Sequence, residues 1–335
     1  MMWNKKKIGE KMRRDSLKII VIVAICTIFS TSLSATKYAG EIFKMGAGVR
    51  NFALGRTGLT DIDSPAMSYW NASLLLNAED NAFELMHSEE FNGLLKYDTV
   101  SGYLGDKNVG FTLSRIGINN VPMTRLTNED YEIGAVLPGD TPNRPYQYKS
   151  VNNSDYILYV GIARFIGSIP VGVTPKVAYR NLAETSAFGF GLDVSMHYEV
   201  SESFITALRI RDIIPTQVYW DTGTKEAVYT GFDVELQFKS TLPILDKPLA
   251  IFLNSEINTD SMRESSTVNI GDVSFDPHIG VELKLHPMVT LLSGYDIEYF
   301  TAGVGLNYKN FLLNYGYERN SALDNSHRIS IGIKN

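Results

Sequence analysis

The sequence predicts an all-β protein, a 14-stranded antiparallel transmembrane β-barrel. The main observation is a strict alternation of apolar residues with polar residues or glycine that recurs from about residue 82 to the C-terminus. Such a strand has one apolar and one polar face, because successive side chains point to opposite sides. Many strands of this kind after an export signal are typical of a barrel with lipid outside and a polar lumen. In residues 188–198 the apolar positions are Phe188, Phe190, Leu192, Val194, Met196 and Tyr198.

The N-terminus predicts export to the bacterial outer membrane by a cleaved signal peptide, residues 1–34. Seven basic residues precede or flank the start of an apolar stretch, residues 19–29, and small residues then lie before Ala35. This is the order of a secretory signal. The alternative is a retained anchor, for which the apolar stretch is short, since a membrane-spanning helix needs about 20 apolar residues.

Composition narrows the classes of function. Loss of the leader would remove seven basic and two acidic residues and change the formal net charge from −6 to −11. Such a balance argues against nucleic acid as a partner. Cys26, the one cysteine, lies in the leader, so no disulfide or thiolate metal site is expected. The five histidines lack metal-ligand spacing and no catalytic motif is found, so we predict neither an enzyme, a metal nor a cofactor.

Fourteen segments carry the strand pattern, and an even number is typical of bacterial single-chain barrels. The segments are residues 82–89, 95–104, 108–118, 155–165, 171–181, 187–199, 203–212, 227–238, 248–257, 274–285, 288–296, 299–308, 311–319 and 326–333. The connections after even-numbered segments are short. Three connections after odd-numbered segments are long, namely residues 119–154, 213–226 and 258–273. This asymmetry predicts short periplasmic turns and long outer loops.

The polar face of these segments carries charges of both signs. Buried charges must be paired or hydrated, which leaves open an ion-pair network holding the barrel or a polar path for a solute. The predicted lumen charges are Asp193, His197, Arg209, Arg211, Asp233, Glu235, His278, Glu282, Lys284, Glu318 and Arg328. On the other face, Tyr308 and Phe311 flank one short turn as interfacial aromatic residues would.

The segment before the strands resembles a known family. Residues 40–50, Gly55, Asp63 and Tyr69-Trp70-Asn71 are similar to the N-terminal pattern of PorV/PorQ-type proteins, which belong to the FadL-like (fatty-acid-transporter-like) outer-membrane barrels. Residues 191–194 with Tyr198, and residues 326–331, are similar to two later strands of that family. Ala72 stands where the family has proline, and the chain ends on Asn335 rather than on an aromatic residue.

The resemblance implies an N-terminal hatch, residues 35–80, that plugs a barrel formed by residues 81–335. It implies that Arg50 and Asp63 are buried hatch charges that pair with the barrel wall. Trp70 and Asn71 are the other hatch candidates, and Asp193 and Arg328 are the candidates on the wall. We also expect Arg50 to pair with Asp193.

Three functions remain open from the sequence. The resemblance to PorV implies an accessory component of protein secretion (type IX-like) that binds secretion proteins or secreted cargo at its outer loops. The alternatives are a FadL-like channel for a hydrophobic small molecule and a structural barrel with a closed lumen. In each case outer-membrane lipids surround the barrel.

Overall fold

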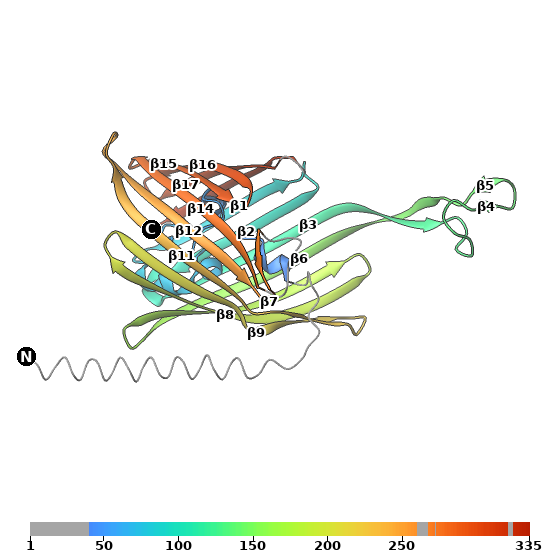
Figure 1. Cartoon of the computed structure of the whole chain (residues 1–335), viewed down its shortest axis with the longest axis horizontal. Coiled ribbons are helices and arrows are strands. Elements are labelled where there is room, and N and C mark those ends of the chain that lie inside the picture. Colours follow the sequence, from blue (N-terminus) through green and yellow to red (C-terminus); the bar gives the residue numbers. More distant parts are fainter. Residues whose placement is uncertain (1–39, 260–266, 272, 321–323) are drawn as a thin grey trace, which may run out of the picture.

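The computed structural model describes residues 40–259, 267–271, 273–320 and 324–335, and within them it shows a closed antiparallel barrel of fourteen strands (Figure 1). The predicted signal peptide lies outside the described residues. Each predicted segment overlaps one wall strand. The wall strands are β1 (Asn81–Glu90), β2 (Leu95–Leu104), β3 (Val109–Leu126), β6 (Pro145–Ile166), β7 (Ile169–Leu182), β8 (Thr185–Ser201), β9 (Phe204–Trp220), β11 (Gly231–Leu242), β12 (Lys247–Asn258), β14 (Val273–His286), β15 (Val289–Asp296), β16 (Tyr299–Tyr308), β17 (Phe311–Arg319) and β18 (Ser326–Lys334).

The barrel closes between its first and last strands. β1 pairs with β18 in a register that places Leu85 opposite Ile331, and β8 pairs with β9, so that the ring of wall strands has no free edge. A closed ring satisfies the backbone hydrogen bonds that lipid cannot. No helix among the described residues is long and apolar enough to span a membrane.

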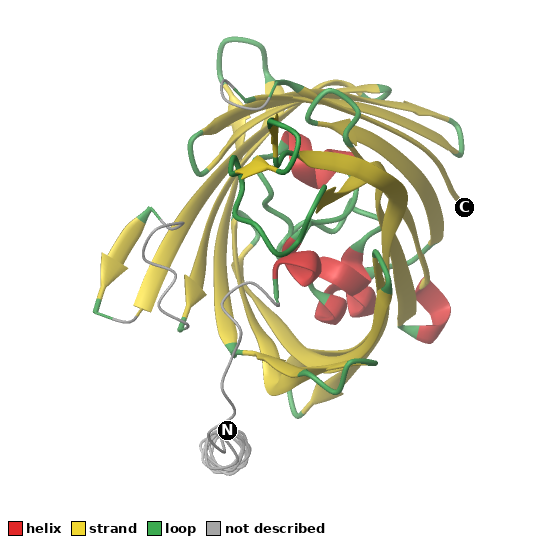
Figure 2. Ribbon diagram, turned by 90° about the vertical axis from the view of Figure 1, so that its right-hand side faces the viewer, coloured by secondary structure: helices red, strands yellow, loops and turns green. Residues whose placement is uncertain are grey.

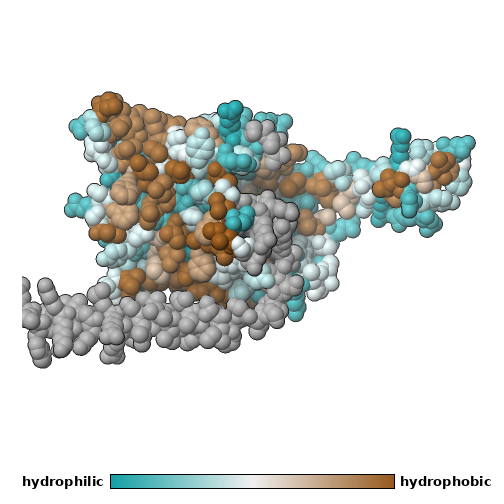
Figure 3. Space-filling model, in the orientation of Figure 1, coloured by the Kyte–Doolittle hydropathy of each residue, from teal (hydrophilic) through white to brown (hydrophobic). Residues whose placement is uncertain are grey.

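The outer face of the wall is apolar, as the alternation predicts. Exposed and buried residues alternate along the whole of β1, and Phe83 and Leu85 are on the exposed side. Phe188 and Phe190 of β8, and Ile329 and Ile331 of β18, are also exposed. Apolar surface is widespread over the barrel in Figure 3. Tyr308 and Phe311 are exposed beside the turn between β16 and β17, where the sequence predicts interfacial aromatic residues.

Short helical pieces of the N-terminal segment lie inside the barrel (Figure 2). They are η1 (Glu41–Lys44), α2 (Val49–Ala53), α3 (Met67–Trp70) and η2 (Ala72–Asn77). Almost all of residues 46–75 are buried, although the helices are too short to be stable alone. Their order therefore comes from the wall around them. Residues 40–80 are called the hatch below.

Wall glycines allow the hatch backbone to approach closely. A Cβ atom at Gly172 of β7 would lie 2.2 Å from the amide nitrogen of Ser73, and one at Gly294 of β15 would lie 2.5 Å from that of Gly55. No larger residue fits at such contacts without moving the hatch. These glycines belong to the glycine-bearing face of the alternation, which the structure places toward the lumen.

The connections are asymmetric, but two long ones are not loops as expected. The turns at one end are short, including η3 (Gly105–Lys107) between β2 and β3. At the other end, β3 and β6 continue their pairing over residues 119–126 and 145–153 as a two-stranded ribbon that projects from the barrel (Figure 1). The ribbon ends in β4 (Val136–Leu137) and β5 (Thr141–Pro142). Sequence reasoning missed it because Asn119, Asn120 and Pro122 interrupt the apolar alternation.

The connection over residues 213–226 is also mostly strand. β9 continues to Trp220 and turns back into β10 (Lys225–Val228), which pairs with it. This is why the strand predicted at residues 227–238 starts later in the structure, with β11. The third long connection, residues 258–273, lies partly outside the described residues and contains β13 (Val268–Ile270), which pairs with β14.

Candidate functional site

The lumen has an apolar region along strands β1 to β3 and β6 to β10, which corrects the expectation of a lumen that is polar throughout. Nine buried apolar side chains of these strands form one cluster with the hatch, although polar side chains such as Ser101 and Lys176 are also buried on the same strands. On the wall, the cluster consists of Met86, Tyr97, Ile116, Ile157, Tyr159, Ala178, Ala187, Val218 and Val228. We call this region the apolar compartment. Its lining can hold an apolar group away from water.

The N-terminal end of the hatch fills this compartment. Phe43 of η1 is buried within the cluster, and Ile42 and Met45 pack against it. The carbonyl oxygen of Phe43 accepts hydrogen bonds from the hydroxyls of Tyr69, at 3.0 Å, and Tyr159, at 3.2 Å. The wall therefore holds η1 by packing, by the hydrogen bond from Tyr159, and by one from the Lys44 ammonium to the side-chain oxygen of Asn258 on β12 at 3.1 Å.

Trp70 joins the hatch to the same cluster. Its indole nitrogen donates to the carbonyl oxygen of Ala47 at 2.7 Å, and its ring meets the Tyr69 ring edge to face at 5.0 Å. The Tyr69 ring in turn meets Tyr159 of the wall at 5.0 Å. Edge-to-face aromatic pairs add to the stabilisation from burial. Trp70, predicted from the sequence pattern, thus joins α3 to Ala47, in the segment between η1 and α2.

The opposite side of the lumen is charged, and Arg50 is the centre of one ion-pair cluster there. Its guanidinium donates to Asp61 of the hatch at 2.8 and 3.1 Å, and also to Glu282 of β14. All three side chains are buried. Two parallel hydrogen bonds to one carboxylate fix the orientation of the guanidinium in addition to pairing its charge. Arg50 thereby connects α2 to the wall.

Asp63 forms a second link to β14. It accepts from Lys284 at 2.9 Å and lies 3.9 Å from Arg50. Contrary to expectation it is not buried, since 39% of its side chain is exposed. Desolvation alone would raise the pKa of this carboxyl group, but the charges of Arg50 and Lys284 have the larger effect and lower its pKa below the usual range.

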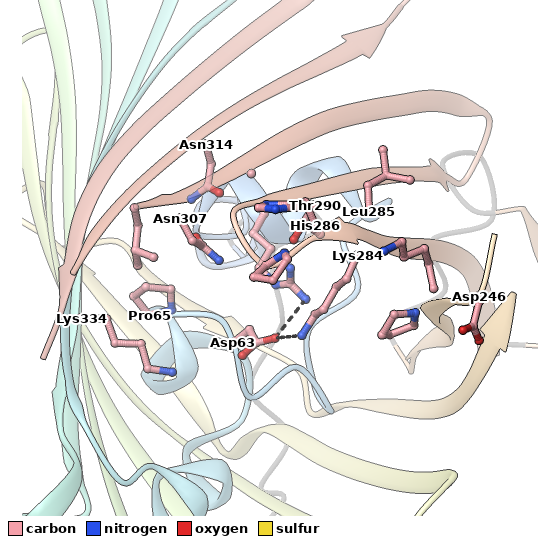
Figure 4. A pocket seen from close by; sticks show the side chains of 16 residues that line it. Asp63, Pro65, Asp246, Lys284, Leu285, His286, Thr290, Asn307, Asn314 and Lys334 are labelled. Carbon is pink, nitrogen blue, oxygen red and sulfur yellow. Dashed lines mark hydrogen bonds and ion pairs between the residues drawn. The ribbon is translucent and has the colours of Figure 1, made fainter. Parts of the chain in front are cut away.

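A cavity of about 440 Å³ opens beside this pair at the short-turn end of the barrel. Figure 4 shows Asp63 and Lys284 pointing toward one another in it, with His286, Asn314 and Lys334 around them. Arg50 also lines the cavity. Water from this end can therefore reach the charged side of the lumen.

Two further wall residues hold the hatch loops. Glu235 of β11 is fully buried and accepts from the backbone nitrogens of Gly58 and Thr60, each at 2.8 Å. Arg209 of β9 donates to the carbonyl oxygen of Tyr69 at 2.8 Å and to Asp233 at 2.6 Å. Both were predicted lumen charges. They serve here as hydrogen-bond partners for hatch backbone, which supports the ion-pair-network interpretation.

Asp193 is buried in the wall but does not pair with Arg50, so that predicted pairing is wrong. Its carboxylate accepts from Lys176 of β7 at 2.8 Å and from the backbone nitrogen of Asp212 at 2.8 Å. The Lys176 ammonium is also 2.7 Å from the Asp212 carboxylate. The partner was available in the sequence, since Lys176 occupies an inward position of its strand. It lies 5.0 Å from the centre of the Phe43 ring, at the border of the apolar compartment.

Arg328 of β18 joins wall charges to the hatch. It is buried, lies 3.0 Å from Glu318 and 2.9 Å from Glu90, and its guanidinium is 4.1 Å from the centre of the Phe52 ring. A guanidinium over an aromatic face is favourable in a desolvated site. Arg328 thus contacts α2 through an aromatic ring rather than through an ion pair.

Asn71 replaces the fixed turn that a following proline would give. Its side-chain oxygen accepts from the backbone nitrogen of Ser73 at 3.0 Å and from the Ser73 hydroxyl at 2.6 Å, so it caps η2. Its amide group donates to the carbonyl oxygen of Leu59 at 2.6 Å. The Ser73 hydroxyl also lies 2.8 Å from the Nδ1 atom of His197 on β8. These three side chains join the end of the hatch to the wall.

Comparisons with known proteins give structural matches but no sequence match. No model of a known protein family matches the chain, and no curated protein does. The toluene transporter TbuX of Ralstonia pickettii superposes with a TM-score of 0.52 at 10% identity, over 86% of this chain and 97% of that chain. The toluene transporter TodX of Pseudomonas putida gives the same values. A FadL homologue of Pseudomonas aeruginosa gives a TM-score of 0.50 at 8% identity, over 86% and 98%.

The chain has the FadL-like fold. This fold is a 14-stranded outer-membrane barrel preceded by an N-terminal segment, as the sequence predicts. Two proteins named as toluene transporters share this fold. At these identities the likeness concerns the fold alone.

Several residues at the site were missed by sequence reasoning. Glu84 of β1 is buried and accepts from Ser330 at 2.8 Å and from Asn314 at 3.1 Å. The two-residue alternation of β1 places both Glu84 and Glu90 on the inward face, so the sequence could have indicated them. Asp61 had no such signal, because its pairing with Arg50 depends on the irregular backbone of the hatch.

Proposed function

We propose that this protein is an outer-membrane channel for hydrophobic small molecules, closed by its hatch. The observation that carries the proposal is the apolar compartment, whose wall residues face inward and whose content is the hatch segment around Phe43. A hydrophobic solute could take the place of η1 and recover the same burial.

The two sides of the lumen support different roles within the hatch. The segment around α2 is bound to the wall by buried ion pairs of Arg50, whereas η1 makes mainly apolar contacts. Apolar packing is not directional, so a ligand can replace it more readily than it can replace paired charges. The similarity in fold to proteins named as toluene transporters also supports a hydrophobic solute.

Uptake by intact cells tests this proposal. A Gram-negative host without such a channel would produce either the full chain or a variant in which Gly172→Val forces the hatch out of place. Radiolabelled naphthalene and radiolabelled glucose would be supplied separately. The proposal expects naphthalene to enter faster in cells that produce the wild-type chain than in cells without the protein. Glucose entry should be the same in both. Equal entry with and without the protein would favour the structural barrel with a closed lumen.

A second candidate is the accessory role in protein secretion, as in PorV/PorQ-type proteins. The observation that favours it is the N-terminal pattern from Arg50 to Asn71, whose spacing matches that family. Purification of the mature protein from its native outer membrane in mild detergent tests it. Co-purification of translocon components or secreted cargo in fixed ratio would support this role, and their absence would leave the channel as the proposal.

A further inference from the structure

The ribbon formed by β3 and β6 ends in an ordered loop outside the barrel. β2 pairs with β3 only as far as Ile118, and β7 pairs with β6 only from Ser154. The ribbon strand over residues 119–126 therefore extends about 26 Å beyond the wall at about 3.3 Å per residue. A two-stranded ribbon alone is marginally stable in water. Its end, residues 127–144, has stabilising contacts of its own, and we call it the knob.

Asn143 organises the knob from within. Its side chain is fully buried, and its amide nitrogen donates to the carbonyl oxygens of Asn128 and Tyr131, each at 2.8 Å, and of Glu132 at 3.2 Å. Its side-chain oxygen accepts from the backbone nitrogen of Asn128 at 3.0 Å. One side chain thus holds the segment over residues 128–132 against the return segment at residue 143.

The knob displays apolar side chains with much of their surface exposed. Ile133 is 73% exposed, Val136 is 64% exposed and Tyr131 is 41% exposed, whereas Leu137 beneath them is buried. Figure 3 shows apolar surface at the far end of the projecting ribbon, surrounded by hydrophilic surface. Exposed apolar groups on a rigid support are typical of an interaction site, because little conformational freedom is lost on binding.

The charge of the knob indicates which kind of partner fits. Residues 127–144 contain four acidic residues, Glu129, Asp130, Glu132 and Asp140, and one basic residue, Arg144. An acidic surface is repelled by anionic lipid. It is also repelled by the same end of a second copy, where the connections at residues 183–184, 221–226 and 297–298 add further acidic residues. A protein with an apolar pocket edged by Lys and Arg is complementary.

We propose that the knob is a docking site for a protein partner that carries a basic rim around an apolar pocket, with Ile133 and Val136 as the anchoring side chains. This site is far from the lumen, so the inference does not depend on the proposed channel. Solute uptake is expected to be unchanged in knob variants, which separates failure of one proposal from failure of the other.

Photo-cross-linking in native cells tests the proposal first. The photoreactive residue p-benzoylphenylalanine would replace Ile133 in the full chain, and the matched control would carry it at Thr124, exposed on the ribbon below the knob. The proposal expects one protein adduct from position 133 and none from position 124. Adducts only with lipid or with a second copy, equal adducts from both positions, or no adduct at all would overturn it.

Binding of the cross-linked protein, once purified, to the whole barrel in nanodiscs completes the test. We expect I133S/V136S to weaken binding at least about tenfold, and E129Q/D130N/E132Q to weaken it and to remove most of its salt dependence. Asn143→Ala should also weaken binding, because it loosens the knob without altering an exposed side chain. Affinity that is indifferent to all three variants would refute the docking site. A heat-shift gel assay would establish that each variant barrel is folded.

Discussion

The hydroxyl of Tyr159 on β6 donates a hydrogen bond to the carbonyl oxygen of Phe43, 3.2 Å away in the hatch. This bond joins the wall of the apolar compartment to the segment that fills it. The opposite side of the hatch is joined to the wall by buried charges, of which Arg50 and Glu282 are one pair. The hatch therefore has one side held mainly by packing and another held by ion pairs.

Loss of Arg50 should release the ion-paired side of the hatch. Arg50→Ala leaves Asp61 and Glu282 buried without their partner, which typically costs about 3–5 kcal/mol. Hydrogen exchange of residues 40–77 in the purified barrel would measure the free energy of local opening. Lys149→Ala, which removes an exposed pair with Glu184, is the control and should leave this free energy almost unchanged, because solvent screens exposed ion pairs. Similar exchange in both variants would contradict the role given to Arg50.

Double-mutant cycles should separate the pair that exists from the pair expected from the sequence. The cycle on Arg50 and Glu282 should give a coupling of about 0.5–3 kcal/mol, because their side chains are in contact. The cycle on Arg50 and Asp193 should be additive within about 0.5 kcal/mol, because Asp193 is paired with Lys176. Coupling in the second cycle and none in the first would mean that the hatch is seated differently.

A methyl group at Gly172 should disturb the seat of η2. Its Cβ atom would overlap the backbone of Ala72 and Ser73, and overpacking of this kind typically costs about 1–3 kcal/mol. Gly172→Ala should therefore increase proteolysis of the hatch in the intact barrel. Gly117→Ala on β3 is the matched control, since its Cβ atom would come no closer than 3.2 Å to another group, the Arg115 guanidinium, and would meet no hatch backbone that close. Equal proteolysis of both variants would argue against close backbone contact.

Acid should weaken the link between Asp63 and β14. The pKa of Asp63 is lowered in the folded protein, so its ion pairs stabilise the fold above the unfolded-state pKa, about 3.9. This contribution is lost as the pH falls below that value through the lowered pKa. Urea unfolding followed by tryptophan fluorescence should therefore show wild type more stable than Asp63→Asn at pH 7, with a smaller difference at pH 3. The effect should be small, because the pair is partly exposed. If the difference in stability between wild type and Asp63→Asn were larger at pH 3 than at pH 7, the lowered pKa of Asp63 would be contradicted.

The barrel could be predicted from the sequence because its physical signal is local. Every wall strand separates lipid from the interior, and the two-residue period records this directly at positions such as Phe188 and Phe190. The ribbon was missed because both of its faces are in water, so it needs no apolar alternation. Thr124 and Gln147, which lie opposite each other there, carry no signal of burial.

The site could be predicted only in part, because its pairings are made across space. Arg50, Trp70 and Asn71 were found through a sequence pattern, and the structure gives each a contact within the hatch or with the wall. The partner of Asp193 was not found. The alternation along a strand shows which residues face inward, but it does not show which inward residues of different strands form an ion pair. The apolar compartment was missed for a related reason: Ile157 and Tyr159 lie in a strand whose outward residues, such as Leu158, are apolar as well.

The measurement that tests the central claim most directly is equilibrium binding of naphthalene to the purified barrel, with the complex then located by crystallography. Wild type and Phe43→Ala would be compared, with Lys149→Ala as the surface control. Burial of a Phe side chain stabilises by about 1.5–3 kcal/mol, so its removal should tighten apparent binding about tenfold or more. The account predicts this gain, with naphthalene lying between Tyr97 and Tyr159. Equal affinity in all three proteins, or a ligand bound outside the apolar compartment, would contradict it.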